Sequence, residues 1–257
     1  KRRKNQREER LRIASIGPAG EKLVKFAMIC IDSHEQKERG GQAGRGGAGA
    51  VMGSKMLKAI AVRGSEKIPL ADPEEFKALA NAATKKVNEN SFIPIRRKYG
   101  TPVWINPVNE FGILPTRNFR ETHFEFAENI SGETMRERIV VADKACASCT
   151  IMCGKQSRIK NGKYAGVELE GPEYELLALL GSNCGISNLD AVAKASLLVD
   201  VLGWDGISTG NVVAFAMECA EKGLIKAHNL AFGREDGYLR LIQMIAMRED
   251  IGDLLAE

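Results

Sequence analysis

Three cysteines in one short segment are the residues best suited to chemistry. Cys146, Cys149 and Cys153 form the motif Cys-x2-Cys-x3-Cys. Two intervening residues let the first two thiolates converge on one centre, and soft thiolate ligands at this spacing select an iron–sulfur cluster or zinc. Both centres normally take four ligands, so a fourth is expected from elsewhere. Spacing alone leaves the metal open, although zinc sites usually show a second paired half, which this sequence lacks.

Other histidine and cysteine residues are weaker candidates for the fourth ligand. His123 is the histidine closest upstream, and a lone histidine is more often structural. Cysteine is among the most buried residue types, so core packing is the better explanation of Cys184 and Cys219. Six unevenly spaced cysteines are typical of a metal site in a reducing compartment rather than of a disulfide framework.

A second candidate is the glycine-rich segment from Gly40 to Gly53. Its many glycines would let the backbone approach a ligand closely. Arg45 would offer a charged fork to a phosphate, with Lys55 and Lys58 adding charge nearby. The segment matches neither the phosphate-binding P-loop nor the dinucleotide fingerprint. A flexible surface loop is the alternative.

Two acidic segments are further candidates. Asp200 and Asp205 flank a glycine turn at Gly203, and paired carboxylates can accept N–H donors from a heterocycle. Four glutamates lie between Glu168 and Glu175, where burial could prepare one for acid–base work. Local sequence favours plainer interpretations of both. In the first, Gly203 ends one helix and Ser208 or Thr209 starts the next; in the second, acids favour a helix N-terminus.

The secondary structure predicted for the segments that carry these residues indicates an α+β fold. The expectation is a short, sheet-containing N-terminal remnant (1–64) followed by a mostly helical domain (65–257). Strands are expected over 11–16 and 57–63, with either a strand or a short helix over 21–31. Asp72-Pro73-Glu74-Glu75 starts a helix that runs to about Asn88, and 94–129 is expected to be rich in loops. A helix is expected to begin at Ser131, and later helices are expected over 173–180, 188–202, 209–222 and 237–247. Within 188–202 a stripe recurs at helical spacing, with Leu189, Val192, Ala193, Ala195, Ser196 and Val199.

Composition is that of an ordinary soluble protein, with 44% hydrophobic and 27% charged residues in a chain of 257. No apolar run reaches membrane-spanning length and no signal peptide opens the chain, so we expect a cytoplasmic protein without a membrane partner. Much of the net charge of +4 lies in Lys1–Arg7. No aromatic residue is interleaved there, so a solvated segment is favoured over a nucleic-acid contact.

Taken together, the motifs resemble those of the tungsten-dependent aldehyde:ferredoxin oxidoreductases. The resemblance runs in order from about Ile13 to the end of the chain. The matching segments are Ile16–Glu21, Ala43–Ile60, Leu114–Phe119, the cysteine triplet, Gly171–Glu175, Asp200-x-x-Gly203-x-Asp205 and Ile251–Glu257.

The resemblance implies a tungsten (or molybdenum) bis-pterin centre, with magnesium bridging the pterins, beside a [4Fe–4S] cluster. By similarity, Cys146, Cys149 and Cys153 ligate the cluster, and the fourth cysteine lies beyond Glu257. Arg45 would contact pterin phosphate, and the Gly46 carbonyl would face the magnesium. Asp200, Gly203 and Asp205 would hold one pterin, and Glu175 would be the acid or base near the metal.

The implied partners are ferredoxin or a similar electron acceptor and a small aldehyde, with a homo-oligomer left open and no nucleic acid. Family members are longer, so the resemblance implies a fragment that is inactive alone. One departure is Trp204, where the family often has leucine. The alternatives are a structural zinc-binding or nucleic-acid-binding module, and an inactive or split subunit of the same family.

Overall fold

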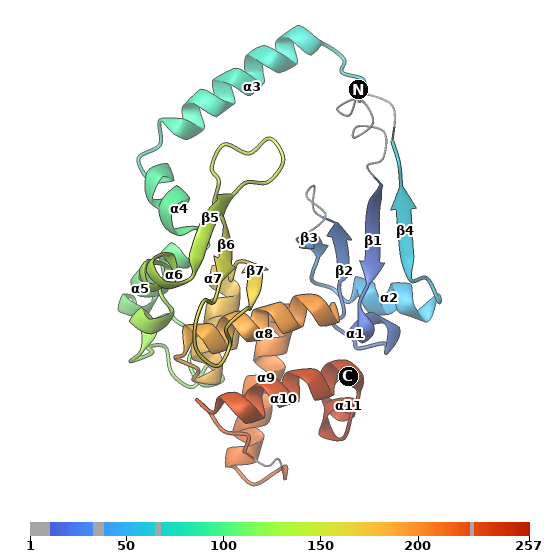
Figure 1. Ribbon diagram of the computed structural model, residues 1–257, viewed down its shortest axis with the longest axis vertical. Coiled ribbons are helices and arrows are strands. Elements are labelled where there is room, and N and C mark those ends of the chain that lie inside the picture. The colour runs from blue at the N-terminus through green and yellow to red at the C-terminus, as the bar shows by residue number, and fades with distance from the viewer. Residues whose placement is uncertain (1–10, 33–38, 65–67, 227–228) are drawn as a thin grey trace.

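The computed structural model describes residues 11–32, 39–64, 68–226 and 229–257. It has a small sheet with two short helices, a long separate helix, and a mostly helical body that carries a second sheet (Figure 1). This arrangement confirms the expected α+β class. The basic segment Lys1–Arg7 lies outside the described residues.

The first sheet is antiparallel throughout, in the order β3-β2-β1-β4. Its strands are β1 (Arg12–Ile16), β2 (Ile29–Asp32), β3 (Arg39–Ala43) and β4 (Ala59–Val62). Strand β1 pairs through Ser15 with both Cys30 and Ala59, so it is a central strand. Helices α1 (Pro18–Glu21) and α2 (Ala48–Ser54) contact each other at one end of this sheet (Figure 1).

In this N-terminal part the predicted strands are confirmed, whereas the predicted glycine-rich loop is wrong. The strands expected over 11–16 and 57–63 are confirmed. The loop expected over Gly40–Gly53 is wrong, because the segment begins as β3 and ends as α2. Glycine has a low propensity for both strands and helices, and tertiary pairing with β2 overrides that propensity here.

Helix α3 (Pro73–Asn88) extends away from both sheets (Figure 1). Asp72 caps it as predicted, with its carboxylate accepting the Glu75 N–H at 2.9 Å. None of its residues is buried, and Phe76 and Leu79 are exposed. The helix is therefore stabilised by its cap and local propensity rather than by packing.

The second sheet and its surrounding helices follow. Strands β5 (Val140–Lys144), β6 (Gly154–Arg158) and β7 (Glu168–Glu170) form an antiparallel sheet in that order. The expected loop region at 94–129 contains α4 (Ile93–Tyr99) and α5 (Ile105–Glu110), so that prediction is wrong in part. Its prolines at helix starts are compatible with short helices. Helix α6 (Gly132–Arg138) begins at the Ser131 cap, as predicted.

The hydrophobic core lies among the C-terminal helices. These are α7 (Tyr174–Leu176), continued as a π-helical turn to Gly181, then α8 (Leu189–Leu202), α9 (Gly206–Glu221), α10 (Glu235–Met247) and α11 (Ile251–Leu255). The α8 stripe read from the sequence, Leu189, Val192, Ser196 and Val199, is buried. Cys184 is also fully buried, which confirms its core role.

Two glycines join the first sheet to the helical body. A Cβ added to Gly17 would lie 2.4 Å from the Leu202 carbonyl oxygen, and one added to Gly203 would lie 2.7 Å from the Gly17 Cα. Both distances are below any real Cβ contact, so only glycine permits this approach. The backbone of Met28 also donates to the Gly203 carbonyl at 2.9 Å. The start of α1 is thereby held against the end of α8.

Candidate functional site

The three cysteines lie in the connection between β5 and β6, which we call the cysteine loop (145–153). Cys146 is exposed, whereas Cys149 and Cys153 are half-buried, and each is a free thiol. The Cys149 N–H donates to the Cys146 carbonyl at 3.0 Å, which closes a turn between the first two ligand positions. The triplet therefore belongs to a β-hairpin rather than to a helix.

The side chains of the cysteine loop do not form a preformed metal cage. Among the residues described, no three His, Cys, Asp or Glu side chains are grouped closely enough to hold a metal ion. His123, on another loop, is exposed. The donor set of three unpaired thiols on one loop nevertheless fits the soft ligands of an iron–sulfur centre.

Gly100 supports the cysteine loop from α4. Its φ is +72°, and a Cβ at this position would lie 2.6 Å from the Cys153 carbonyl oxygen. The neighbouring Thr101 faces the segment that contains the glutamates. Its hydroxyl donates to the Glu173 carboxylate and accepts the Tyr174 N–H at 2.9 Å. Gly100 and Thr101 thus connect the cysteine loop with the Gly171–Glu175 segment.

The two glutamates of this segment have different environments. Glu175, the predicted acid or base, is exposed in the described chain. Glu173 is largely enclosed, and its burial raises the pKa of its carboxyl above the ordinary 4.5. The Thr101 hydrogen bond opposes that rise in pKa, and the Glu175 charge adds to it. Sequence reasoning missed Glu173 as the perturbed group because its partner, Thr101, is 72 residues away.

The start of α9 lies directly beside the glutamate segment. A Cβ added to Gly206 would lie 2.2 Å from the Leu176 Cδ2 atom, so this glycine admits the leucine next to Glu175. Asp205, the residue before it, is the N-cap of α9. Its carboxylate accepts the Ile207 and Ser208 N–H groups at 3.2 and 3.1 Å.

This cap revises one expectation. Asp205, rather than Ser208 or Thr209, is the N-cap of α9. Its carboxylate accepts the capping hydrogen bonds, and the Ser208 hydroxyl donates to it as well. The predicted end of the preceding helix at Gly203 is confirmed, with Gly203 in the left-handed conformation at φ +79°.

The glycine-rich segment meets the Asp200–Asp205 motif. Arg45 Nε lies 3.4 Å from Asp205 Oδ2. Gln42 Nε2 donates to Asp200 Oδ1 at 2.9 Å, across 158 residues of sequence. Two of the motifs identified in the sequence therefore form one surface, which we call the Arg45 face (Gln42, Arg45, Asp200 and Asp205).

The backbone beside Arg45 is open. Gly46 has φ +93°, and a Cβ at Gly41, Gly44 or Gly46 would meet nothing within 4 Å. An open glycine backbone beside a mostly exposed guanidinium and two carboxylates has the donor and acceptor types that a phosphate-bearing heterocycle needs. These residues therefore fit a pterin, by chemistry and by access.

Trp204 lies in the core behind this surface. It is fully buried and stacks on Phe26, with ring centroids 5.4 Å apart and an interplanar angle of 17°. Its indole Nε1 has no hydrogen-bond partner among the residues that the structure describes. The departure from the family's leucine therefore changes internal packing.

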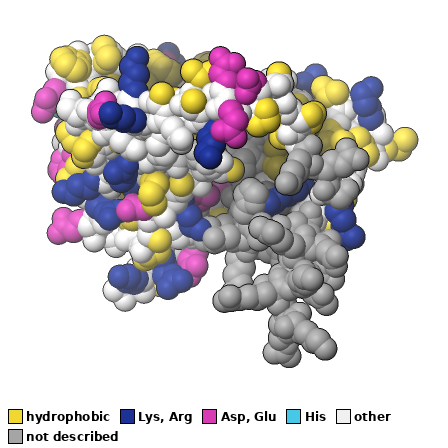
Figure 2. Space-filling view, turned by 90° about the horizontal axis from the view of Figure 1, so that it is seen from above, with side chains coloured by type: hydrophobic (Ala, Val, Ile, Leu, Met, Phe, Trp, Pro, Cys, Tyr) yellow, Lys and Arg dark blue, Asp and Glu magenta, His cyan; other side chains and the backbone are white. Residues whose placement is uncertain are grey.

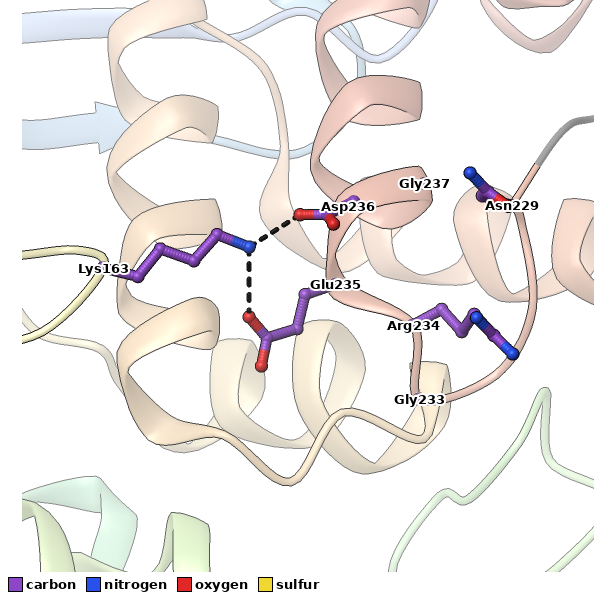
Figure 3. Close-up of a pocket in the computed structure, with 7 residues that line it drawn as sticks. All are labelled: Lys163, Asn229, Gly233, Arg234, Glu235, Asp236 and Gly237. Carbon is purple, nitrogen blue, oxygen red and sulfur yellow. Dashed lines mark hydrogen bonds and ion pairs between the residues drawn. The ribbon is translucent and has the colours of Figure 1, made fainter.

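A separate open pocket of about 510 Å³ lies at the start of α10 (Figure 3). Lys163 Nζ lies 2.6 Å from Asp236 Oδ1 and 3.8 Å from Glu235 Oε2. Desolvation, aided by a hydrogen bond to Glu235, raises the pKa of Tyr164 to about 12. None of the predicted site residues lines the pocket. Its charges pair with one another and connect the β6–β7 loop to α10.

Comparisons with known proteins define the class. The sequence matches "Aldehyde ferredoxin oxidoreductase, N-terminal domain" over residues 1–64 and "Aldehyde ferredoxin oxidoreductase, domains 2 & 3" over residues 78–257. The chain belongs to the aldehyde ferredoxin oxidoreductase family, whose named members are oxidoreductases.

Particular relatives agree with this assignment. The chain is 44% identical to a tungsten-containing aldehyde ferredoxin oxidoreductase of Pyrococcus furiosus, over 99% of this chain and 42% of that protein. It is 43% identical to the enzyme of the same name from Thermococcus kodakarensis, over 96% of this chain and 40% of that protein. The chain thus spans about two fifths of the length of these relatives.

A solved structure shares the fold. The active site complex BamBC of benzoyl coenzyme A reductase, in complex with 1,5-dienoyl-CoA, matches with a TM-score of 0.72 and 27% identity. The match covers 99% of this chain and 39% of that one.

No single helix among the described residues has the length and apolarity needed to cross a membrane, and one sharply bent pair, Tyr174–Cys184 with Leu189–Leu202, has them by length and composition alone.

Proposed function

We propose that the protein oxidises aldehydes to carboxylic acids at a tungsten (or molybdenum) bis-pterin centre and passes the electrons through a [4Fe–4S] cluster to ferredoxin. The observation that carries this proposal is the Arg45–Asp205 contact at 3.4 Å, which unites two distant family motifs on one open surface. Family membership and the tungsten-containing relatives support it.

On this proposal each part of the site has a distinct task. Cys146, Cys149 and Cys153 hold the cluster, with a fourth ligand from outside this chain. Arg45 binds a pterin phosphate, the Gly46 carbonyl faces the bridging magnesium, and Asp200, Gly203 and Asp205 hold one pterin. When bound, the metal and pterins accept the two electrons of the oxidation, and the cluster transfers them singly.

We assign the proton transfers of the reaction to the Gly171–Glu175 segment. Glu175, exposed in this chain, is the proposed acid or base near the substrate. Glu173, with its raised pKa, lies two residues away, and the charges of the two carboxylates interact. A proton held on Glu173 would therefore remove a like charge from beside the proposed acid or base.

The domain and partner assignments are also proposals. Residues 1–64 would end a pterin-cradling domain, and 65–257 would form most of a helical domain that carries the cluster ligands. On the face seen from above, acidic and basic side chains are interspersed (Figure 2). On that face an acidic ferredoxin would have to dock at a local basic patch.

Metal analysis of the complete natural protein tests the proposal. Tungsten or molybdenum together with iron and acid-labile sulfide is the expected result, whereas one zinc without iron would favour a structural zinc module. The Cys149→Ser variant should lose aldehyde-dependent reduction of ferredoxin. Cys219→Ser, which changes a half-buried thiol outside the cysteine loop, is the matched control. Reduction of ferredoxin by Cys149→Ser at the parent rate would contradict the cluster assignment.

A further inference from the structure

A fully buried lysine lies beneath the cysteine loop. Lys155 is the second residue of β6, and its side chain is 1% exposed. Its ammonium donates to the carbonyls of Met152, Cys153 and Gly154, each at 3.2 Å. A buried ammonium is costly unless its hydrogen bonds are satisfied, so these carbonyls offset its desolvation.

A second cation continues the same pattern along the loop. Arg97, on α4, donates through Nη2 to the Thr150 carbonyl at 3.0 Å and through Nε to the Ile151 carbonyl at 3.4 Å. Five successive carbonyls, from Thr150 to Gly154, therefore accept from two side chains. The two cations are joined to each other, because Lys155 Nζ donates to the Arg97 carbonyl at 2.8 Å.

The charges around this pair leave a positive excess. Asp143 lies 3.2 Å from Lys155 Nζ and also pairs with Arg136 at 2.5 Å. Asp143 is thus shared by two cations, Arg97 adds a third, and the Glu173 carboxyl also interacts electrostatically with Lys155. An ordinary buried ion pair would leave the site neutral and would not contact a run of loop carbonyls.

The direction of the carbonyls has a consequence for the opposite side of the loop. A trans peptide places N–H and C=O on opposite sides. Carbonyls held towards Arg97 and Lys155 therefore turn the next N–H groups, including that of Cys153, away from the cations. Amide donors and nearby positive charge stabilise the more negative, reduced state of a thiolate-bound cluster.

We propose that Arg97 and Lys155 form a cation clamp that fixes the Thr150–Gly154 half of the cysteine loop and raises the reduction potential of the cluster bound there. The second half of this inference rests on the proposed function. The first half concerns the loop itself and holds without a cluster.

The test uses Lys155→Met, Lys155→Arg and the control Lys160→Met in the complete natural protein. Lys160 is an exposed lysine just beyond the same strand. Hydrogen exchange of the Thr150–Gly154 amides is measured in cluster-free protein, and the cluster midpoint potential is measured by a redox titration followed by electron paramagnetic resonance. Lys155→Met should speed loop exchange by about tenfold or more and shift the potential to more negative values.

The control variants distinguish the loss of the clamp from a general loss of stability. Lys155→Arg keeps the charge and should hold the potential close to that of the parent, and Lys160→Met should change neither readout. Removing one partner of a buried charge cluster is typically strongly destabilising, so global stability is measured for each variant by urea denaturation, and a folded Lys155→Met protein with a loose loop is the distinctive result. If that variant does not fold, Arg97→Gln removes the two bonds to Thr150 and Ile151 from a half-buried position and should speed their exchange.

One outcome would contradict the clamp, and another would contradict the proposed function. A folded Lys155→Met protein with parental loop exchange and parental midpoint potential would overturn the clamp. A parent protein without any cluster would refute the proposed function, while the exchange measurement would still decide whether the two cations fix the loop.

Discussion

Arg45 Nε lies 3.4 Å from the Oδ2 atom of Asp205, and the two side chains differ sharply in exposure, at 65% and 7%. Asp205 is held by the first turn of α9, which donates two backbone N–H groups to it. Arg45 therefore approaches a fixed carboxylate from a solvated position. An ion pair that is solvated on its arginine side contributes about 0–1 kcal/mol, so an anionic ligand could draw the guanidinium away at little cost.

Arg45→Ala is expected to lower cofactor content without unfolding the protein. The free energy of unfolding should change by less than about 1 kcal/mol, because the pair is solvent-exposed on the arginine side. Tungsten or molybdenum per chain, measured by elemental analysis, should fall clearly below the parent value. Lys77→Ala removes an exposed cation on α3, away from the Arg45 face, and serves as control. Equal metal content in Arg45→Ala and the parent would argue against a phosphate contact.

Gly100→Ala should disturb the cysteine loop. The new methyl would lie 2.6 Å from the Cys153 carbonyl oxygen, at a backbone φ of +72° that disfavours alanine. We expect a loss of about 2 kcal/mol or more in stability and a lower iron content. Gly112→Ala is the matched control, since Gly112 has φ +68° but its nearest new contact is at 4.0 Å. Similar iron loss in both variants would mean that the contact with Cys153 is unimportant.

Asp205→Ala should cost more stability than Asp72→Ala. Both residues are helix N-caps, and removal of such a cap typically costs about 0.5–2 kcal/mol. Asp205 accepts from the Ile207 and Ser208 N–H groups and pairs with Arg45 in a buried position, whereas Asp72 accepts one bond from Glu75 on an exposed helix. Urea denaturation of both variants checks the order. Asp205→Ser retains capping ability and should recover most of the loss.

Glu173→Gln should alter the pH dependence of stability. The pKa of Glu173 is raised above its ordinary 4.5, so between these two pKa values the folded state keeps a proton that the unfolded state releases. The parent therefore loses free energy of unfolding as pH rises through that interval. Glu173→Gln should gain stability relative to the parent as pH increases from about 4.5 towards neutrality. Denaturation curves across this range, with the exposed Glu74→Gln as control, measure the difference.

Local signals in the sequence predicted many elements correctly. The Asp72-Pro73 start, the Ser131 cap and the α8 stripe are short-range patterns, and each depends on residues within one or a few helical turns. The glycine-rich segment defeated the same reasoning, because its strand exists only through pairing with β2. Propensity describes the isolated chain, and this strand is a tertiary feature.

The residues of the candidate site were recognised by type and order rather than by geometry. Local reasoning favoured a plain cap at Ser208 or Thr209, whereas the cap is Asp205, whose carboxylate also faces Arg45. The contact between Thr101 and Glu173 and the position of Lys155 under the loop had no sequence signal, since their partners lie on other elements.

The close backbone contact between Gly17 and Gly203 also bears on motion. Because no side chain separates them, the two backbone segments are in direct contact, and neither can easily slide or tilt on the other. The first sheet and α8 should therefore move together as one rigid unit. A side chain at either glycine would push the two segments apart. It would thereby move Arg45 away from the Asp205 carboxylate that faces it.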